Sequence, residues 1–311
     1  MNRAIIEQAF KGAPLLFLLL WASGFVFAAM GLAHTDPMTL LALRYFLVVI
    51  VLIPLFLALK PGLPDSAAQW FHVAVVGLCI QVFFFGGVYM SLEFGLSAGA
   101  VALIASLHPI IVGALAAPLV GERVGVLGWL GLALGLLGAA IVITSRMAVE
   151  ATSILGVLFA VVSLLAMTSA TLYEKRFGVA QHPVTANIIQ CGLGFLILAP
   201  LAVLFEPLHI NWTGEFLVAM TYLVLANSLI AVTLLLAMVR RGLASRVSAL
   251  FFLVPPLSAL IAWLLLAEVM PAAAWGGIVV AAVGVALINE PGRKLQEIIR
   301  KRLGGAEQDA P

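Results

Sequence analysis

Polar side chains that could bind a small solute are rare in this sequence, and each stands within a long apolar stretch. Arg44 is the one formally charged residue well inside such a stretch. Gln81 and Asn227 carry amides that donate and accept hydrogen bonds, which suits the two ends of a zwitterion. His108 precedes Pro109, and an imidazole titrating near neutrality could couple proton movement to transport. These residue types point to reversible binding of a small polar molecule.

Each of these residues also has a structural interpretation, which the sequence alone leaves open. An isolated guanidinium in hydrocarbon costs on the order of several kcal/mol, so Arg44 must face a cavity or a partner. It would either attract a substrate carboxylate or be satisfied by carbonyl groups. Buried amides often join neighbouring membrane helices. A histidine beside a proline bend can equally stay neutral and hydrogen bonded.

Small hydroxyl residues and aromatic residues complete the candidate substrate-binding set. Ser23 and Ser169, with Thr168, lie at matching depths in the first and sixth apolar stretches, where they either bind a ligand or permit close packing. An apolar cavity with a few polar anchors would suit aromatic or bulky apolar substrates. The aromatic candidates are Trp21, Phe27, Phe85, Tyr89, Tyr173 and Phe251.

The sequence lacks the residue groups that an intramembrane enzyme or an ATP-driven pump would need. Its glutamates fall at the ends of apolar stretches or in loops, at Glu93, Glu122, Glu206 and Glu268. This argues against an antiporter built on a buried acid and favours facilitated exchange or downhill export. The two cysteines stand in apolar stretches and are interpreted as packing residues. The absence of a glycine-rich phosphate loop predicts transport without ATP hydrolysis. Because no acid pair, metal cluster or activated nucleophile stands at mid-membrane depth, we expect no enzyme activity, no cofactor and no metal.

The elements that carry these residues are predicted to be membrane-spanning helices. Of 311 residues, 64% are hydrophobic and 10% are charged, and the mean hydropathy is +1.19. Apolar stretches of about 20 residues recur, a length that crosses a bilayer as one helix. An all-α polytopic membrane protein follows. The ten predicted spans are 13–33, 37–59, 68–91, 97–120, 125–144, 152–173, 183–205, 215–238, 245–267 and 271–289.

Lysine and arginine predict the orientation of these spans. If the N-terminus is inside, nearly all of the 16 basic residues fall in cytoplasmic segments. The exceptions are Arg44 within the second span and Arg146 in an outer loop. The positive-inside rule therefore predicts that both termini are cytoplasmic. The charged tail is either an amphipathic end at the inner surface or a solvated terminus.

An internal repeat divides the chain into two halves. At a shift of 146 residues Pro37 meets Pro183 and Trp129 meets Trp275. Five spans per half is an odd number, so the halves must cross the membrane in opposite senses. Inverted repeats of this kind give alternating access to a site near the midplane. The predicted boundaries are 1–149 for the first repeat, 150–290 for the second, inverted repeat and 291–311 for a cytoplasmic tail.

Prolines inside the fourth and ninth spans are candidates for gating hinges. Pro109 meets Pro256 after a one-residue slip of the repeat, and Pro255 precedes the latter. A proline removes a backbone hydrogen bond and bends a helix. These positions are therefore either hinges about which half-helices rock or static kinks.

Three segments carry a resemblance to a known family. The segment 40–46 (LLALRYF) resembles a motif of the EamA family, which belongs to the drug/metabolite transporter superfamily. So does 99–123, with its central proline and its ending Gly-Glu-Arg, and so does its echo at 245–268. The resemblance covers essentially the whole chain, as two EamA-like five-helix repeats. It implies a secondary transporter, while members of the family carry amino acids, other metabolites and drugs.

Within that superfamily the chain most resembles bacterial exporters of amino acids and related metabolites, including the YddG-type exporters of aromatic amino acids. The resemblance implies a central cavity ringed by the first four spans of each repeat, in a bacterial inner membrane. It favours a structural role for Arg44, because an arginine recurs there in members with varied substrates.

We therefore expect export of aromatic or other apolar amino acids and related metabolites by alternating access. The alternatives are a multidrug or cationic-compound exporter of the same superfamily and, with less support, a channel or an intramembrane enzyme. The expected partners are the small-molecule substrate and the lipid bilayer, without nucleic acid. Glycine-rich fifth and tenth spans fit either a weak homodimer or close packing within a monomer.

Overall fold

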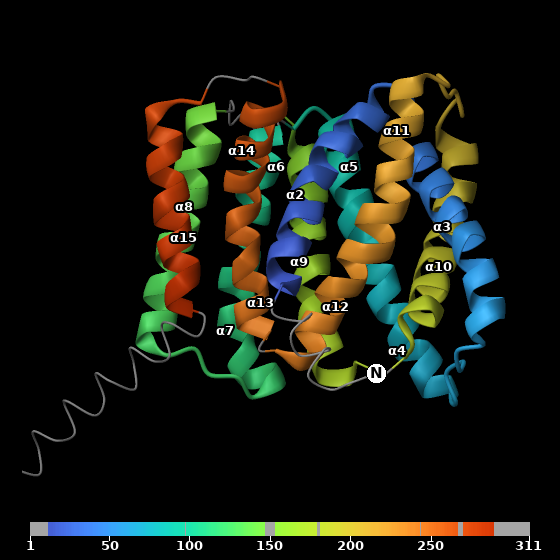
Figure 1. Ribbon diagram of the computed structural model, residues 1–311, viewed down its shortest axis with the longest axis horizontal. Helices are drawn as coiled ribbons and strands as arrows, with labels where there is room; N and C mark the ends of the chain where they lie inside the picture. The colour runs from blue at the N-terminus through green and yellow to red at the C-terminus, as the bar shows by residue number, and fades with distance from the viewer. Residues whose placement is uncertain are drawn as a thin grey trace, which may run out of the picture.

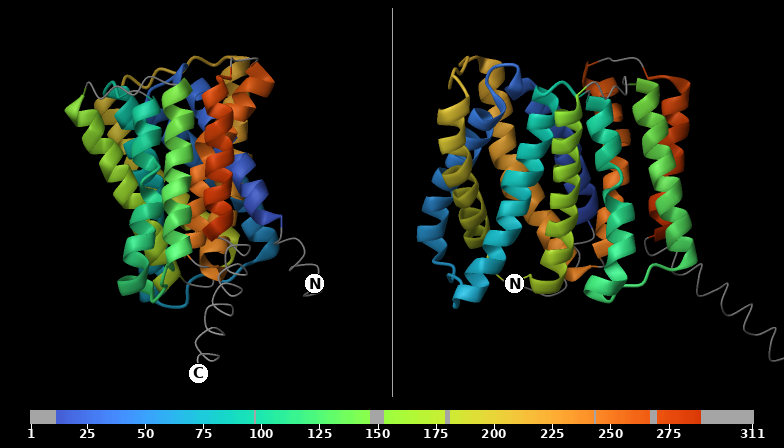
Figure 2. Two further views of the ribbon diagram at one scale, coloured as in Figure 1. Left: turned by 90° about the vertical axis from the view of Figure 1, so that its left-hand side faces the viewer. Right: turned by 180° about the vertical axis from the view of Figure 1, so that it is seen from behind.

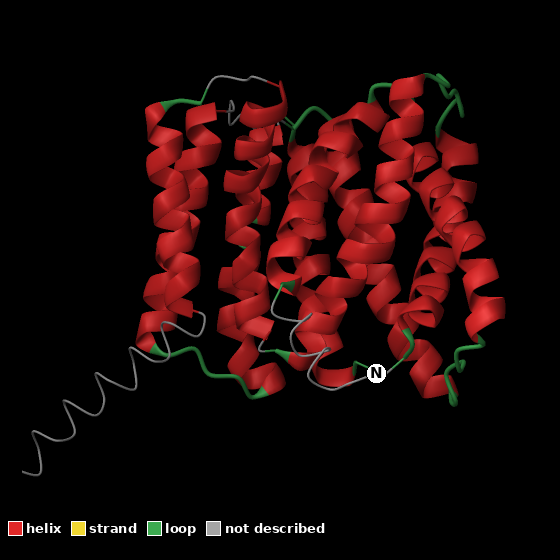
Figure 3. Ribbon diagram, in the orientation of Figure 1, coloured by secondary structure: helices red, strands yellow, loops and turns green. Residues whose placement is uncertain are grey.

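The described part of the chain contains α-helical, π-helical and 3-10 segments and no strand (Figure 3). A computed structural model describes residues 12–96, 98–146, 153–178, 181–242, 244–266 and 270–288. In these ranges nine helical segments are long and apolar enough to cross a membrane, and Ala272–Ile288 is a shorter apolar helix. The predicted all-α polytopic class is confirmed. The predicted tail from residue 291 lies outside the described residues.

The first five spans match the predicted ranges to within about one helical turn. They comprise α2 (Ala13–Leu32), α3 (Pro37–Leu59), α4 (Ala67–Gly77) with η1 (Leu78–Phe84) and α5 (Phe85–Glu93), α6 (Ala98–Ala105) with α7 (His108–Val120), and α8 (Val126–Arg146). Prolines at the starts of α2 and α3 suit the first turn, where no backbone N–H is needed.

The second five spans repeat this order. They comprise α9 (Ile154–Phe177), α10 (Pro183–Phe205), α11 (Gly214–Tyr222) with η2 (Leu223–Ala231) and α12 (Val232–Arg241), α13 (Ala244–Ala249) with η3 (Leu250–Leu253) and α14 (Val254–Leu266), and α15 (Ala272–Ile288). Ser153 and Thr213 cap α9 and α11 by accepting backbone N–H groups from Gly156 and Phe216.

The two repeats run in opposite directions through the bundle. In Figure 1, α2 rises toward the upper edge, whereas its counterpart α9 descends from that edge. The beginning of α2 and the end of α15 both lie toward the lower edge of the bundle (Figures 1 and 2). We call this edge the terminal face and the opposite edge the far face. The predicted inverted arrangement of two five-helix repeats is confirmed.

The fifth and tenth spans, α8 and α15, pack against each other at one end of the bundle (Figure 1). Glycines allow their backbones to touch. A Cβ atom at Gly138 would collide with the backbone of Ala281, and one at Gly284 would collide with the backbone of Gly135. These glycines therefore serve packing within one chain. The second and seventh spans, α3 and α10, pack against each other at the other end of the bundle (Figure 1).

Large apolar side chains cover the outside of the bundle. Leu57, Leu196, Leu204 and Phe205 are each more than half exposed, whereas Trp21, Arg44 and Tyr45 are among the largest fully buried side chains. An exposed apolar surface of this extent marks contact with lipid in a protein of this helix length. Several polar side chains of the protein, including Arg44, Gln81 and Asn227, are instead buried inside the bundle.

Four spans are interrupted near their middles. The third and eighth contain the π-helical segments η1 and η2, at equivalent repeat positions. The fourth breaks between α6 and α7 directly before Pro109, and the ninth passes through η3 directly before Pro255 and Pro256. The predicted bends thus lie at these prolines, while their role as hinges stays a prediction.

Candidate substrate-binding site

Arg44 joins the first repeat to the second. It stands in the first half of α3 with a fully buried side chain. Its Nε donates to Ser228 Oγ at 2.7 Å, and its Nη2 donates to Asn227 Oδ1 at 2.7 Å. The guanidinium carbon lies 4.6 Å from the ring centroid of Phe85. Arg44 is therefore held by polar groups of η2 and by an aromatic face, while its Nη1 is buried without a partner.

The partner Asn227 is positioned by a π-helical turn and by a glycine. A π turn inserts one residue into a helix and is frequent at functional sites. Asn227 Nδ2 donates to the carbonyl of Leu20 at 3.4 Å. A Cβ atom at Gly24 would overlap the amide group of Asn227, so α2 can approach η2 only with glycine there.

Gln81 holds the repeat position of Asn227 in η1 but has no bonding partner for its side chain. Its Nε2 and Oε1 are both buried and unpaired, and its backbone carbonyl accepts the hydroxyl of Tyr45 at 2.7 Å. Gln190 on α10 is also buried, with an unpaired Oε1. Each buried donor or acceptor that is left unpaired lowers the stability of the folded protein by about 1–3 kcal/mol, so a hydrogen-bonding partner for these amide groups would be stabilising.

Aromatic residues gather beside Arg44, whose guanidinium lies over the ring of Phe85. Trp21 contacts the rings of Phe17, Phe84, Phe85 and Phe251, with centroid separations from 5.3 to 6.0 Å. The predicted residues Trp21, Phe85 and Phe251 thus come together from α2, α5 and η3.

His108 borders the same aromatic group. Its ring lies 5.0 Å from that of Phe251, edge to face. Thr168 Oγ1 donates to the carbonyl of Leu164, so it accepts from Nδ1–H of His108 at 3.2 Å. His108 Nε2 is then a bare acceptor, buried without a partner. The histidine therefore offers one acceptor atom beside an aromatic wall.

Four other predicted residues lie apart from this cluster. Ser23 bonds to Tyr222, and Phe27 stacks on the same tyrosine at 3.9 Å beside a groove of about 470 Å³. Tyr173 bonds to the imidazole of His72 at 2.7 Å. Ser169 is exposed on α9. The structure therefore does not bring these residues to the buried polar cluster.

A cavity of about 530 Å³ opens at the far face. It is bounded by the α2–α3 connection, the end of α5 and the segment after α10, and Tyr89 is part of its wall. Tyr89 is 4% exposed and lies within electrostatic reach of Arg44. The last predicted aromatic residue therefore connects the cavity to the polar cluster.

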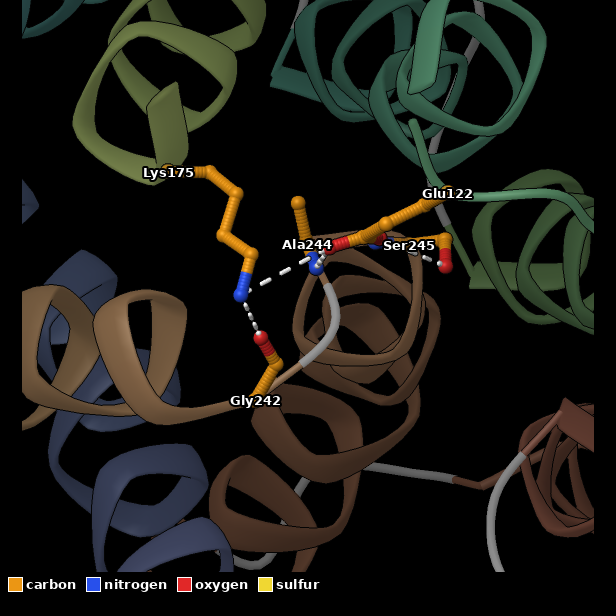
Figure 4. Close-up of polar contacts among 5 residues, drawn as sticks. All are labelled: Glu122, Lys175, Gly242, Ala244 and Ser245. Atoms are coloured by element: carbon orange, nitrogen blue, oxygen red, sulfur yellow. Dashed lines mark hydrogen bonds and ion pairs between the residues drawn. The ribbon is translucent and has the colours of Figure 1, made fainter. Parts of the chain in front are cut away.

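The terminal face is held together by polar contacts that the sequence did not reveal (Figure 4). Glu122 accepts the backbone N–H groups of Ala244 at 3.0 Å and Ser245 at 3.3 Å, and lies 3.7 Å from Lys175 Nζ. Lys175 also donates to the carbonyl of Gly242. These contacts join α7, α9, α12 and α13.

A buried ion pair adds to these terminal-face contacts. Glu174 on α9 bonds to Arg240 at the end of α12, and the Glu174 side chain is 3% exposed. Arg176 donates to the carbonyl of Leu119 at 2.8 Å. The ends of both repeats are therefore closed against one another on this side.

Comparison with known proteins identifies the family. Two copies of the model for the EamA-like transporter family match residues 11–144 and 154–290. The chain belongs to the EamA-like transporter family. The resemblance seen in the sequence is thereby confirmed.

Two curated EamA relatives are similar over most of their length. An uncharacterized transporter of Bacillus subtilis, YvbV, is 24% identical over 277 residues, with 88% of each chain covered. A probable amino-acid metabolite efflux pump of Salmonella typhimurium is 22% identical over 297 residues, which is 92% of this chain and 96% of that one. A solved crystal structure at 21% identity has a TM-score of 0.77, covering 90% of this chain and 97% of the other, and shares the fold.

Membership of the EamA family and the names of both relatives point to a transporter rather than an enzyme. A membrane-embedded EamA transporter binds a small-molecule substrate and lipid. Among the residues that sequence reasoning missed, Gln190 had a detectable signal, since it meets Arg44 at the repeat shift. Ser228 and Tyr45 had none, because their roles depend on contacts between helices.

Proposed function

We propose that this EamA protein is a secondary transporter that exports amino acids with aromatic or other apolar side chains, and related metabolites, by alternating access. The observation that carries this proposal is the buried cluster of Arg44, His108 and aromatic rings beside Tyr89 and the far-face cavity. An apolar site with a few polar anchors is typical of small-molecule recognition.

The cluster offers separate groups for each part of an amino acid. Arg44 Nη1 is unpaired and suits a carboxylate oxygen. His108 Nε2 is an unpaired acceptor and suits an ammonium group, and the ring of Phe251, 5.0 Å from the imidazole, adds an aromatic surface beside it. Phe85 and Phe251 suit an apolar side chain.

Charge distribution supports an exporter whose terminal face is cytoplasmic, in a bacterial inner membrane. Basic residues of the described ranges that stand at this face are Lys60, Arg123, Lys175, Arg176, Arg240, Arg241 and Arg246. By the positive-inside rule this is the inner side. The closed terminal face and the cavity at the far face are what an outward-facing state of such an exporter requires. The efflux name of the Salmonella relative supports the direction.

Counterflow in liposomes tests this proposal. Purified protein is reconstituted with an unlabelled amino acid inside, and entry of labelled amino acid is followed across a panel of side chains. We expect saturable counterflow, faster for aromatic and large aliphatic amino acids than for glutamate or lysine. Unsaturable conductance without counterflow would instead indicate a channel. No flux for any amino acid would overturn the proposed substrate class.

A second candidate is export of cationic compounds. Asp36 and Glu93 line the far-face cavity, and carboxylates at an exit attract cations. The aromatic group around Trp21 would also accept a flat cation. A cationic dye in the same liposome panel separates the two candidates, because only the second predicts its saturable exchange in place of amino acids.

A further inference from the structure

Two polar pairs in this protein are related by the internal repeat. At the shift of 146 residues Arg44 meets Gln190, and Gln81 meets Asn227. Arg44 and Gln190 stand in the second span of their repeats, and Gln81 and Asn227 stand in the π-helical segments η1 and η2. Each pair therefore combines the second span of one repeat with the π segment of the other.

The structure contains one of these pairs formed and the other unformed. Arg44 Nη2 donates to Asn227 Oδ1 at 2.7 Å. In contrast, Gln81 Nε2, Gln81 Oε1 and Gln190 Oε1 are buried without any partner. The two glutamines are nevertheless on helices in contact, because a Cβ atom at Gly77, next to η1, would lie 2.8 Å from Gln190 Cα.

Inverted repeats explain why a pair should exist without being formed. The two end states of such a transporter arise when the halves exchange conformations around the site. In the exchanged state α10 takes the relation to η1 that α3 has to η2 here. Gln190 then reaches Gln81, and Arg44 leaves Asn227.

We propose that Gln81 and Gln190 bond to each other when the protein opens to its terminal face, replacing the Arg44–Asn227 bond of the present state. The inference rests on the proposed alternating-access transport. It makes Gln190 a positioning residue of the transport cycle and gives Gln81 the same role. The unpaired amide atoms of this state, Gln81 Nε2 and Oε1 and Gln190 Oε1, are the bonding groups of the other state.

Methionine substitutions test this exchange, because methionine is unbranched and apolar and is similar in length to glutamine. Gln81→Met and Gln190→Met remove unpaired groups from the present state and a hydrogen bond from the other state. We expect each to raise the thermal midpoint by about 2–4 °C and to slow counterflow roughly 5-fold. The double variant should be no slower than the slower single variant, since the same bond is lost.

Gln181→Met is the matched control, since Gln181 lies before α10 and already bonds to Gln69 at 3.2 Å. It should leave the counterflow rate at the parental value. A lower thermal midpoint or an unchanged rate in the Gln81 and Gln190 variants would overturn the exchange. So would slowing in the double variant that equals the product of the two singles.

A labelling experiment reads the conformational equilibrium without transport. Leu92 lines the far-face cavity, so Leu92→Cys in a background without Cys79 and Cys191 reports opening to an impermeant maleimide. Gln190→Met should raise the labelling rate, whereas Asn227→Leu should lower it. Shifts in the same direction would overturn the proposal. Lack of transport by the parental protein would instead refute the proposed function, while the labelling and melting results still test the pairing.

Discussion

At the scale of single residues, the buried Arg44 controls much of the polar interior. Its charge is compensated by two neutral acceptors from η2 and by the face of Phe85. Removing one partner of a buried charge costs more than removing the charge itself, because the charge then stays buried and uncompensated. Arg44 and Asn227 should therefore respond unequally to substitution.

We predict that Asn227→Leu destabilises the protein more than Arg44→Leu. The asparagine variant leaves the guanidinium without its Oδ1 acceptor and should cost about 3–5 kcal/mol. The arginine variant leaves unpaired neutral groups and should cost about 1–3 kcal/mol. Thermal melting in detergent measures both, and the double variant should recover part of the loss. Equal losses of stability in the two single variants would show that the Arg44–Asn227 hydrogen bond contributes little to stabilising the buried charge of Arg44.

Gly24 is predicted to be intolerant of alanine. The added methyl group would overlap the Asn227 amide and push it from Arg44, so we expect a loss of about 1–3 kcal/mol by melting. Gly86→Ala is the control, since nothing lies within 4 Å of a Cβ atom there. That variant should be neutral or stabilising because alanine favours a helix. Similar melting of both variants would contradict the close contact.

At the scale of elements, the spans were predictable and their interruptions only partly so. Apolar length and prolines marked every described span and the bends before Pro109 and Pro255. The π-helical segments η1 and η2 carry no proline or glycine signal inside them. Their form depends on packing against other helices, such as Asn227 on α2. The sequence of one span alone therefore does not predict a π-helical segment within it.

Replacing Pro255 and Pro256 together by alanine tests whether the bend in the ninth span is a hinge. Alanine restores two backbone N–H groups and favours a straight helix in place of η3. For a hinge we expect counterflow to slow about 10-fold while the melting temperature is maintained or raised. A parental rate with a straightened span would identify a static kink.

At the scale of the whole molecule, the all-helical fold, the inverted repeat and the family were all predictable from sequence. The candidate site was predictable in part. Trp21, Arg44, Phe85, His108, Asn227 and Phe251 come together, whereas Ser169 is exposed although its repeat partner Ser23 bonds to Tyr222. The two halves adopt different local environments, which a repeat in the sequence does not disclose. A monomer or weak homodimer stays a prediction.

The closure of the terminal face yields a prediction for the whole conformational equilibrium. Glu174→Gln weakens the pair with Arg240 and should favour the state that opens to that face. We expect slower maleimide labelling at Leu92→Cys in the far-face cavity. Asp65→Asn at an exposed position of the same face is the control and should leave labelling unchanged. Faster labelling of the Glu174 variant would contradict this role.

The glycine contact between α8 and α15 limits which parts of the bundle can move. Where the two backbones touch, no side chain between them can change rotamer to let the helices slide. We therefore expect α8 and α15 to move as one unit. Each helix belongs to a different repeat, so we expect the two repeats to stay joined at this contact when the rest of the bundle moves. In the proposed alternating-access cycle, we therefore expect lipids beside α8 and α15 to keep the same neighbours, while lipids beside the central spans rearrange at each turnover.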